Sequence, residues 1–323
     1  MLVNMRELLG VAERGHFAVP AFNISNYAMF NGIMDISEQK SAPVIIEIHP
    51  NELKHIGTDV VAGMVRRAES STVPVVIHLD HGASFANVMV AIRAGFTSVM
   101  IDASGLPFEE NVAACQKVVE AAHAAISYVS CSDDGDPRRA EVPDGDEWHY
   151  VPSQLVRNVS VEGELGNIGT TEVDKAFDQV IHYTQPDEAV RFVAETGIDC
   201  LAVAIGTCHG LYPKGYVPQL KLDLLRTIKQ ALADADLDCR LVLHGGSNNP
   251  DDEIAEAARI GITKINISSD IKAAYYQEMR RVLENQALRE PNEIEPPCIK
   301  AMQVVAAQKI DLFGCAGKAA LYR

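Results

Sequence analysis

The sequence has no long apolar run. No stretch approaches the roughly 18–20 uninterrupted apolar residues that a membrane-spanning helix needs, so we expect no membrane partner. The first residues, Met1 to Glu7, hold no apolar run behind a basic start, and we expect no signal peptide. The seven cysteines include no Cys-x-x-Cys pair. Scattered thiols of this kind are typical of a reducing compartment, which predicts a cytoplasmic protein.

Positive charge is also scarce. The chain has 28 Lys and Arg against 44 Asp and Glu, which gives a formal net charge of -16. This balance argues against a general role on nucleic acid or at a membrane surface. An anionic substrate would therefore have to be bound by a local site and not by the overall field of the protein.

The chain is dominated by a repeated unit, in which a short β-branched run is followed by a longer helical stretch. Runs such as 75–79 and 201–205 are typical of strands buried on both faces, as parallel strands are. Eight candidate strands follow this pattern: 17–23, 43–49, 73–80, 98–102, 159–165, 200–205, 240–244 and 262–267. Eight such units favour an α/β fold closed into a (β/α)8 TIM barrel. No Gly-x-Gly-x-x-Gly motif follows the first strand, which argues against an open dinucleotide-binding fold.

The length fits a single barrel with insertions, so we expect one domain over residues 1–323. Helices are predicted at 108–125, 186–195 and 251–260. The segment at about 127–158 breaks the pattern, because it is rich in turn-forming residues and holds the only tryptophan, Trp148. It is either a solvated surface loop, the commoner case, or a lid or subunit contact anchored by Trp148.

Three histidines follow predicted strands. In a barrel the carboxyl ends of the strands meet at one mouth, and His81, His209 and His244 follow the third, sixth and seventh strands. A lone histidine at such a place is more often structural than a ligand. Three of them equal the number of protein ligands that catalytic zinc takes, which favours a zinc site at the mouth.

Further polar groups are predicted at the same mouth. Asp80 and its neighbour His81 would diverge in a strand, so Asp80 would face a substrate and act as general acid and base, unless it is an aspartate that caps a loop. The loops at 245–247 and 266–269 are small and polar. Barrels commonly bind phosphate at the loops after their last two strands, and backbone N–H groups there favour an anion.

Eight motifs stand in order along nearly the whole chain: Phe17–Asn23, His78–His81, Met100–Ser104, Val161–Gly166, Ala202–Gly210, Leu243–Ser247, Lys264–Ile267 and Leu312–Lys318. With these motifs the chain resembles the class II ketose-bisphosphate aldolases, of the fructose- and tagatose-bisphosphate type. The resemblance implies a metal-dependent aldehyde-lyase, an aldolase. Its reaction would be the reversible, zinc-dependent retro-aldol cleavage of a ketose 1,6-bisphosphate to dihydroxyacetone phosphate and an aldehyde.

The resemblance also implies roles for single residues. The ligands of zinc (Zn2+) would be His81, His209 and His244, and Glu164 and Asp102 match positions that can hold a second or displaced metal. Asp80 matches the acid/base for the proton of the C4 hydroxyl group. Glu172 matches the glutamate that removes or returns the proton on the triose carbon.

Substrate contacts follow from the same resemblance. The matching positions are Asn23, Gly210, Gly245, Gly246, Ser247, Asn266, Ile267, Ser268 and Ser269. Backbone carbonyls near these glycines bind a monovalent cation, Na+ or K+, in relatives. Lys272 is the candidate residue for binding the distal phosphate, although an arginine would bind a phosphate better through two parallel hydrogen bonds. Relatives form dimers or tetramers, so we expect a homo-oligomer.

The chain departs from the family pattern at three places. Relatives usually have glycine at the positions of Asn248 and Asn249. They carry small residues where the second predicted strand of this chain ends in Glu-Ile-His, at 47–49. They often have Asp-Pro-Arg where this chain has Glu-Pro-Asn, at 290–292. These departures favour a ketose 1-phosphate with a non-phosphorylated distal end as a second candidate substrate. A lyase for unphosphorylated sugar acids and a non-catalytic phosphosugar-binding barrel are two more hypotheses. A Schiff-base mechanism is disfavoured, because it needs a lysine at a strand end inside the mouth.

Overall fold

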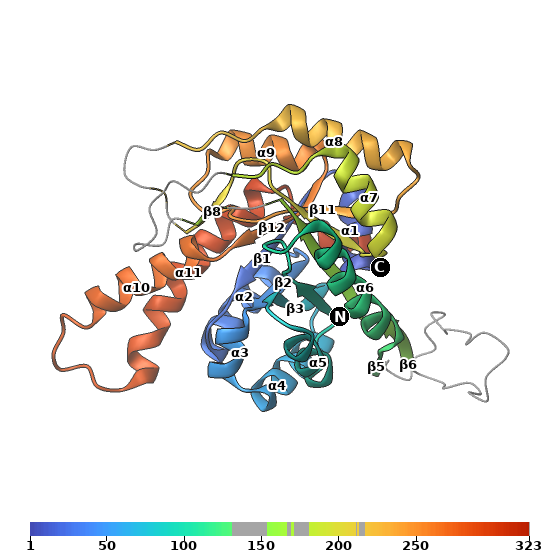
Figure 1. The fold of residues 1–323 in the computed structure, drawn as a ribbon. Helices are drawn as coiled ribbons and strands as arrows, with labels where there is room; N and C mark the ends of the chain where they lie inside the picture. The colour runs from blue at the N-terminus through green and yellow to red at the C-terminus, as the bar shows by residue number, and fades with distance from the viewer. Residues whose placement is uncertain (131–153, 167–168, 171–180, 211, 213–216, 323) are drawn as a thin grey trace.

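The structure, a computed structural model, describes residues 1–130, 154–166, 169–170, 181–210, 212 and 217–322. Its centre is a closed barrel of parallel strands (Figure 1). In their order around the barrel the strands are β1 (Val19–Asn23), β2 (Val44–Ile48), β3 (Val75–Gly82), β4 (Ser98–Ile101), β7 (Ser160–Leu165), β9 (Cys200–Val203), β11 (Arg240–Leu243) and β12 (Ile262–Ile267). The last strand pairs with the first, with Val19 opposite Lys264. The predicted (β/α)8 TIM barrel is confirmed.

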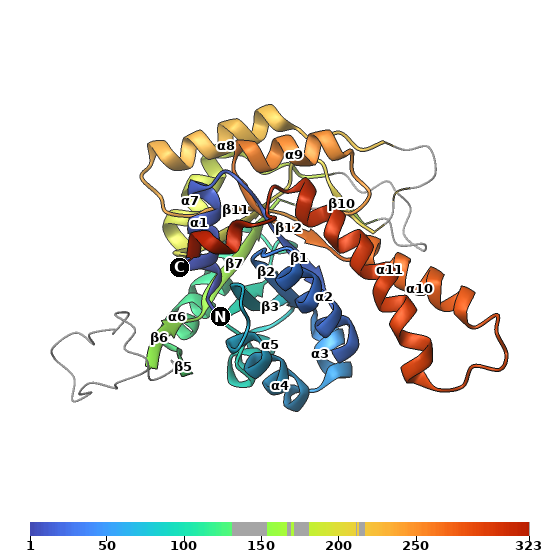
Figure 2. The same ribbon diagram turned by 180° about the vertical axis from the view of Figure 1, so that it is seen from behind.

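Helices surround the barrel (Figure 2). They are α1 (Met5–Arg14), α2 (Tyr27–Gln39), α3 (Pro50–Ile56), α4 (Thr58–Glu69), α5 (Phe85–Ala94), α6 (Phe108–Ala124), α7 (Pro186–Thr196), α8 (Leu222–Asp234), α9 (Asp251–Ile260), α10 (Ser269–Val282), α11 (Pro291–Leu312) and the 3₁₀ helix η1 (Lys318–Tyr322). The three helices predicted at 108–125, 186–195 and 251–260 correspond to α6, α7 and α9. None of the helices in the described ranges is both long enough and apolar enough to cross a membrane.

Local sequence explains where the elements begin and end. The side chains of Asn4, Asn26 and Ser84 accept hydrogen bonds from the first turns of α1, α2 and α5, which satisfies backbone donors that have no partner inside a helix. Gly95 ends α5 and Gly197 ends α7, both in the left-handed backbone region that glycine enters without steric cost. Every residue of β1, β2 and β12 is buried, so these strands can be apolar on both faces.

The segment predicted as an excursion at about 127–158 has paired ends. β5 (Ile126–Ser130) and β6 (Gln154–Asn158) form an antiparallel ribbon, from Ile126 opposite Asn158 to Ser130 opposite Gln154. The sequence analysis did not recognise these two ends as strands. Trp148 lies outside the described residues. A second small pair, β8 (Gly169–Thr170) with β10 (Cys208–His209), is parallel.

Helices α10 and α11 pack against each other and project from the barrel as a long hairpin, in both views. Helix α11 also packs on α2, which fixes the base of the hairpin. Helix α10 begins directly after β12, so its N-terminus lies at the carboxyl-terminal mouth of the barrel.

Candidate metal centre and active site

A cavity of about 850 Å³ opens at the carboxyl ends of the strands. Its wall comes from most of the strand ends and the loops that follow them, as expected for the functional face of such a barrel. The residues that line it include Asn23, His49, Asn51, Glu52, Asp80, His81, Asp102, Ser104, Glu164, His209, Gly210, Gly245, Ser247, Asn266, Ser268, Ser269 and Lys272.

Three imidazoles meet at this cavity: His81 and His209 line it, and His244 lies fully buried beside them. The ring centroids of His81 and His244 lie 4.8 Å apart, those of His81 and His209 5.0 Å, and those of His209 and His244 5.9 Å. One nitrogen from each ring lies within 4.8 Å of the other two. The structure therefore brings together three residues that are separated by up to 163 positions in the chain (244 − 81).

The end of β3 explains how neighbouring residues both face the cavity. His81 has a backbone φ of 47°, a left-handed conformation that is uncommon for a residue other than glycine. This bend interrupts the alternation of side chains along the strand, and the pairing with β4 shifts between Leu79 and Gly82. A Cβ atom on Gly82 would stand 2.4 Å from the carbonyl oxygen of Met100, so only glycine fits there. Strained residues of this kind cluster at functional sites.

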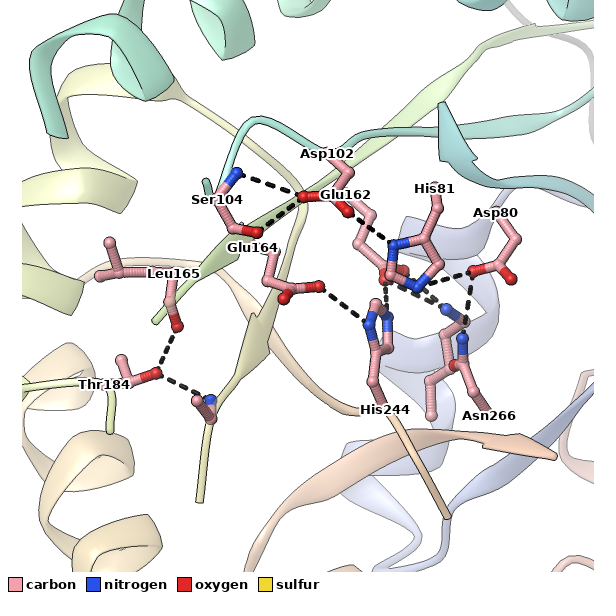
Figure 3. A network of polar contacts seen from close by, with 12 residues as sticks. Asp80, His81, Asp102, Ser104, Glu162, Glu164, Leu165, Thr184, His244 and Asn266 are labelled. Atoms are coloured by element: carbon pink, nitrogen blue, oxygen red, sulfur yellow. Dashed lines mark hydrogen bonds and ion pairs between the residues drawn. The ribbon is translucent and has the colours of Figure 1, made fainter. Parts of the chain in front are cut away.

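In two of the three rings, one nitrogen lies within hydrogen-bond distance of a carboxylate (Figure 3). His81 Nδ1 lies 2.8 Å from Asp102 Oδ2, and His244 Nε2 lies 2.8 Å from Glu162 Oε1. Within the described residues, His81 Nε2 and His244 Nδ1 make no hydrogen bond of acceptable geometry, although His244 Nδ1 lies 3.0 Å from Glu164 Oε2. Metal-ligating histidines usually carry such an outer carboxylate, which fixes the tautomer and the ring orientation. The donor set therefore fits a divalent ion bound by the inward nitrogens.

The carboxylates around the three rings shift the pKa values of His81 and His244 in the direction expected for a site that binds a cation. Burial alone would lower the pKa of His81, but the charge of Asp80 and the hydrogen bond with Asp102 raise it to about 9. Burial would likewise lower the pKa of His244, but the hydrogen bond with Glu162 and the nearby carboxylate of Glu164 raise it to about 10. Burial and the charges of the other two rings lower the pKa of His209 to about 3. The nearby carboxylates thus favour positive charge at His81 and His244, and a divalent ion bound there would supply it.

Asp102 and Glu164 lie beside the three histidines. With His81 they form a second group whose ligand atoms lie within 4.8 Å of one another. Asp102 Oδ1 accepts hydrogen bonds from the backbone N–H (3.2 Å) and the hydroxyl group (2.7 Å) of Ser104. These bonds hold Asp102 in the orientation that it needs toward His81.

Asp80 is 5% exposed and is bound by two amides. Asn23 Nδ2 donates to Asp80 Oδ2 at 2.8 Å, and Asn266 Nδ2 donates to Asp80 Oδ1 at 3.2 Å. Burial would raise the pKa of Asp80, but the nearby positive charges of His81 and His244 lower it well below its usual range. The carboxylate is thus ionised, oriented by two amides and part of the cavity wall, so it can accept a proton from a bound molecule.

The predicted phosphate loops lie on one side of the cavity. Gly210, Gly245, Ser247, Ser268 and Ser269 line it, and α10 begins at Ser269 without a side-chain cap at Ser268. The free N–H groups of a helix N-terminus and the helix dipole favour an anion at this place.

Two predicted substrate contacts lie behind that wall. Ile267 is fully buried at the end of β12. The backbone N–H of Gly246 donates to Asn266 O at 3.1 Å, and a Cβ there would stand 2.4 Å from the Ile265 side chain. Among the described residues, neither Gly246 nor Ile267 lines the cavity. They support the loops and do not form their surface.

Lys272 lies at the far edge of the cavity, paired with Glu52 of α3. Glu52 also accepts hydrogen bonds from the Ser25 hydroxyl group (3.0 Å) and from the backbone N–H of His49 (3.1 Å). His49 caps α3, since its Nδ1 accepts from the N–H of Asn51 at 3.2 Å. The predicted binder of a distal phosphate is therefore already neutralised by a carboxylate.

Sequence reasoning missed a buried charge cluster beneath the metal centre. Lys264 is fully buried, and its Nζ lies 2.8 Å from Glu47 Oε1 and 2.9 Å from Glu162 Oε2. Glu162 in turn holds His244. The sequence places Glu162 and Glu164 two positions apart on the strand at 159–165, so both can face the mouth, but it does not show that Glu162 pairs with Lys264. Glu172, the predicted proton carrier on the triose carbon, lies outside the described residues.

The family match covers residues 3–129 and 150–318, and the family is described as class-II fructose-bisphosphate aldolase. A fructose-bisphosphate aldolase of Geobacillus stearothermophilus is 37% identical over 325 residues, which cover 99% of each chain. The crystal structure of the YdjI aldolase from Escherichia coli K12 is similar, with a TM-score of 0.78 and 31% identity, over 99% of this chain and 100% of that one. A putative fructose-1,6-bisphosphate aldolase from Coccidioides immitis has a TM-score of 0.79 and 26% identity over 98% of both chains. The chain therefore belongs to the class II fructose-bisphosphate aldolase family and is a lyase.

Proposed function

We propose that this enzyme cleaves a ketose 1,6-bisphosphate, of the fructose or tagatose type, to dihydroxyacetone phosphate and an aldehyde in a zinc-dependent retro-aldol reaction. The observation that carries the proposal is the convergence of His81, His209 and His244, two of them held from behind by carboxylates. When bound there, Zn2+ would act as a Lewis acid for the negative charge that develops on the substrate's oxygen atoms.

Asp80 begins the cleavage in this proposal. Its carboxylate takes the proton of the C4 hydroxyl group, the C4 oxygen forms the aldehyde carbonyl, and the C3–C4 bond breaks with its electron pair left on C3. Asn23 and Asn266 hold the two oxygens of Asp80, so the proton is accepted in a fixed direction. A proton returned to C3 completes dihydroxyacetone phosphate, and we propose Glu172 as its carrier.

The phosphate on C1 would lie against Gly210, Gly245, Ser247 and the first residues of α10. Short side chains there let the backbone approach an anion closely. The helix N-terminus at Ser269 adds a favourable field. This half of the substrate would be held while the aldehyde half leaves.

The reducing, cytoplasmic setting proposed for the reaction is supported by the six buried cysteines of the described residues, all of which are free thiols.

One observation favours a second candidate, a ketose 1-phosphate whose distal end carries no phosphate. Among the described cavity-lining residues, Lys272 is the one Lys or Arg, and Glu52 neutralises it. Burial lowers the pKa of His49, so this neighbour is also uncharged at neutral pH. Neutral polar groups suit hydroxyl groups better than a phosphate dianion.

A substrate panel separates the candidates. Fructose 1,6-bisphosphate, tagatose 1,6-bisphosphate and several ketose 1-phosphates would be compared as kcat/KM, with chelator and after zinc is restored. Cleavage of a bisphosphate that is lost with chelator and regained with zinc is expected. Glu52→Gln keeps the hydrogen bond to His49 and removes the charge, so it should shift preference toward the bisphosphate by roughly tenfold. Cleavage that persists without any divalent metal would contradict the proposal.

A further inference from the structure

The loop after β11 contains a buried amide that faces backbone carbonyl groups. Asn249 Nδ2 donates to the carbonyl oxygen of Gly245 at 2.6 Å and to that of Ser247 at 3.0 Å. Asn249 is 8% exposed. An amide nitrogen carries two hydrogens, so these two carbonyls use both of its donors.

The amide is itself held in place. Its Oδ1 accepts from the Tyr212 hydroxyl group at 3.4 Å, and the Tyr212 oxygen accepts from the backbone N–H of Cys208 at 2.8 Å. The loops after β9 and β11 touch at this point, since a Cβ on Gly245 would stand 2.4 Å from the carbonyl oxygen of Cys208. This chain of contacts fixes which end of the amide faces the carbonyls.

These carbonyls belong to the loop where the family resemblance predicts a monovalent cation. A cation of this kind needs several oxygen ligands at one point, as carbonyl groups provide in ion-selective sites. Here the oxygens of Gly245 and Ser247 already accept hydrogen bonds from one buried amide, whose N–H groups carry partial positive charge and would repel a cation bound to the same two oxygens. The residues therefore do not fit a bound Na+ or K+.

We propose that Asn249 replaces the monovalent cation, so that this enzyme shapes its phosphate loop without Na+ or K+. The inference rests on the proposed function, because the loop is the proposed site of the C1 phosphate. Asn249 acts as a positioning residue: its amide neutralises two carbonyl dipoles behind Gly245 and Ser247, which both line the cavity. The positive end of the amide thus takes the place of the cation's charge.

The experiment compares KCl and NaCl with choline chloride at equal ionic strength. For the zinc-loaded wild type, KM, kcat and Tm should be the same in the three salts, within about twofold for the kinetic constants. Asn249→Gly frees both carbonyls, so KM for the phosphorylated substrate should rise roughly tenfold in choline and be restored by K+ or Na+. Its Tm should also rise specifically with one of these cations. Asn249→Asp is a second variant of the same shape, which should show the same dependence more strongly.

Asn248→Gly is the matched control. Asn248 is the neighbouring amide, is exposed, and has a left-handed φ of 56° that glycine adopts freely. It should show no cation dependence. A wild type that loses roughly tenfold in activity in choline would overturn the inference, and so would an Asn249→Gly variant as indifferent to salt as the wild type. Failure of the proposed function would look different: no ketose phosphate would be cleaved in any salt, while the Tm series would still test Asn249.

Discussion

At the scale of single residues, the site depends on how the rings of His81 and His244 are held. Each ring gives one nitrogen to a carboxylate at 2.8 Å. The other nitrogen of His81 lies 3.7 Å from Asp80 Oδ1, and that of His244 lies 3.0 Å from Glu164 Oε2. The carboxylates around the two rings raise the pKa of both, so protons and a divalent ion compete for the same imidazoles. Metal binding and proton binding are therefore linked.

This linkage predicts a steep pH dependence of zinc affinity. The pKa values of His81 and His244 are raised to about 9 and about 10, so both rings are protonated at neutral pH and must lose a proton to bind zinc. His209, with its pKa lowered to about 3, has no proton to lose. The logarithm of the zinc affinity should rise by about two for each pH unit between about pH 6 and pH 8. Competition with a chelating dye at several pH values measures this slope.

Asp102→Asn provides the matched variant for that measurement. It removes a negative partner whose hydrogen bond raises the pKa of His81, so the slope should fall toward about one. Loss of an outer carboxylate should also weaken zinc binding by roughly 10–100-fold. A wild-type slope near zero would mean that the rings are not the ligands.

Asp80→Ala tests the proton step at the same scale. Asp80 is bound by Asn23 and Asn266, and its Oδ1 lies 3.7 Å from His81 Nε2, but it is not one of the proposed zinc ligands. The variant should lose roughly 10²–10⁴-fold in kcat while it still binds one zinc ion, because general base catalysis typically contributes that much. Metal content by elemental analysis and steady-state kinetics check the two halves. Unchanged turnover would mean that another group takes the proton of the C4 hydroxyl group.

At the scale of elements, the eight barrel strands could be predicted because each is a short apolar run that needs burial on both faces. The end of β3 could not be predicted in detail, because its course depends on the left-handed bend at His81 and on contact with β4. The β5–β6 ribbon was missed, since turn-forming residues dominate the segment between its strands. The cluster around Lys264 was missed for another reason: its partners come from β2 and β7, and only the closed barrel brings them together.

The Lys264 cluster joins three strands across the barrel interior. Lys264→Met should destabilise the protein by about 3–5 kcal/mol, because it leaves Glu47 and Glu162 buried without their cation. Thermal unfolding should show a fall in Tm of roughly 4–7 °C. Arg226→Ala is the control, since Arg226 pairs with Glu256 at the surface and such pairs contribute under about 1 kcal/mol. An equal fall in Tm for the two substitutions would show that the buried cluster contributes no more to stability than a surface ion pair.

At the scale of the whole molecule, the barrel and the segment between β5 and β6 are separable in the sequence. The family match stops at residue 129 and resumes at 150, so most of that segment has no counterpart in the family pattern. The ribbon pairs up to Ser130 opposite Gln154, at the right separation for a tight turn to close it. We therefore expect the barrel to fold without residues 131–153.

Replacing residues 131–153 with Asn-Gly tests the two interpretations of this segment. Asn-Gly favours the type I′ turn that continues the twist of an antiparallel pair, so Ser130 and Gln154 should stay paired. If the segment is a surface loop, kcat should stay within about twofold of the wild type and the oligomeric state should not change. If it is a lid or a subunit contact, kcat should fall at least roughly tenfold, or sedimentation velocity should show smaller particles. Trp148→Ala in the full-length chain tests whether the Trp148 ring anchors such a lid or contact. If it does, the substitution should cause the same fall in kcat or in particle size as the deletion. If the segment is a solvated loop, neither quantity should change.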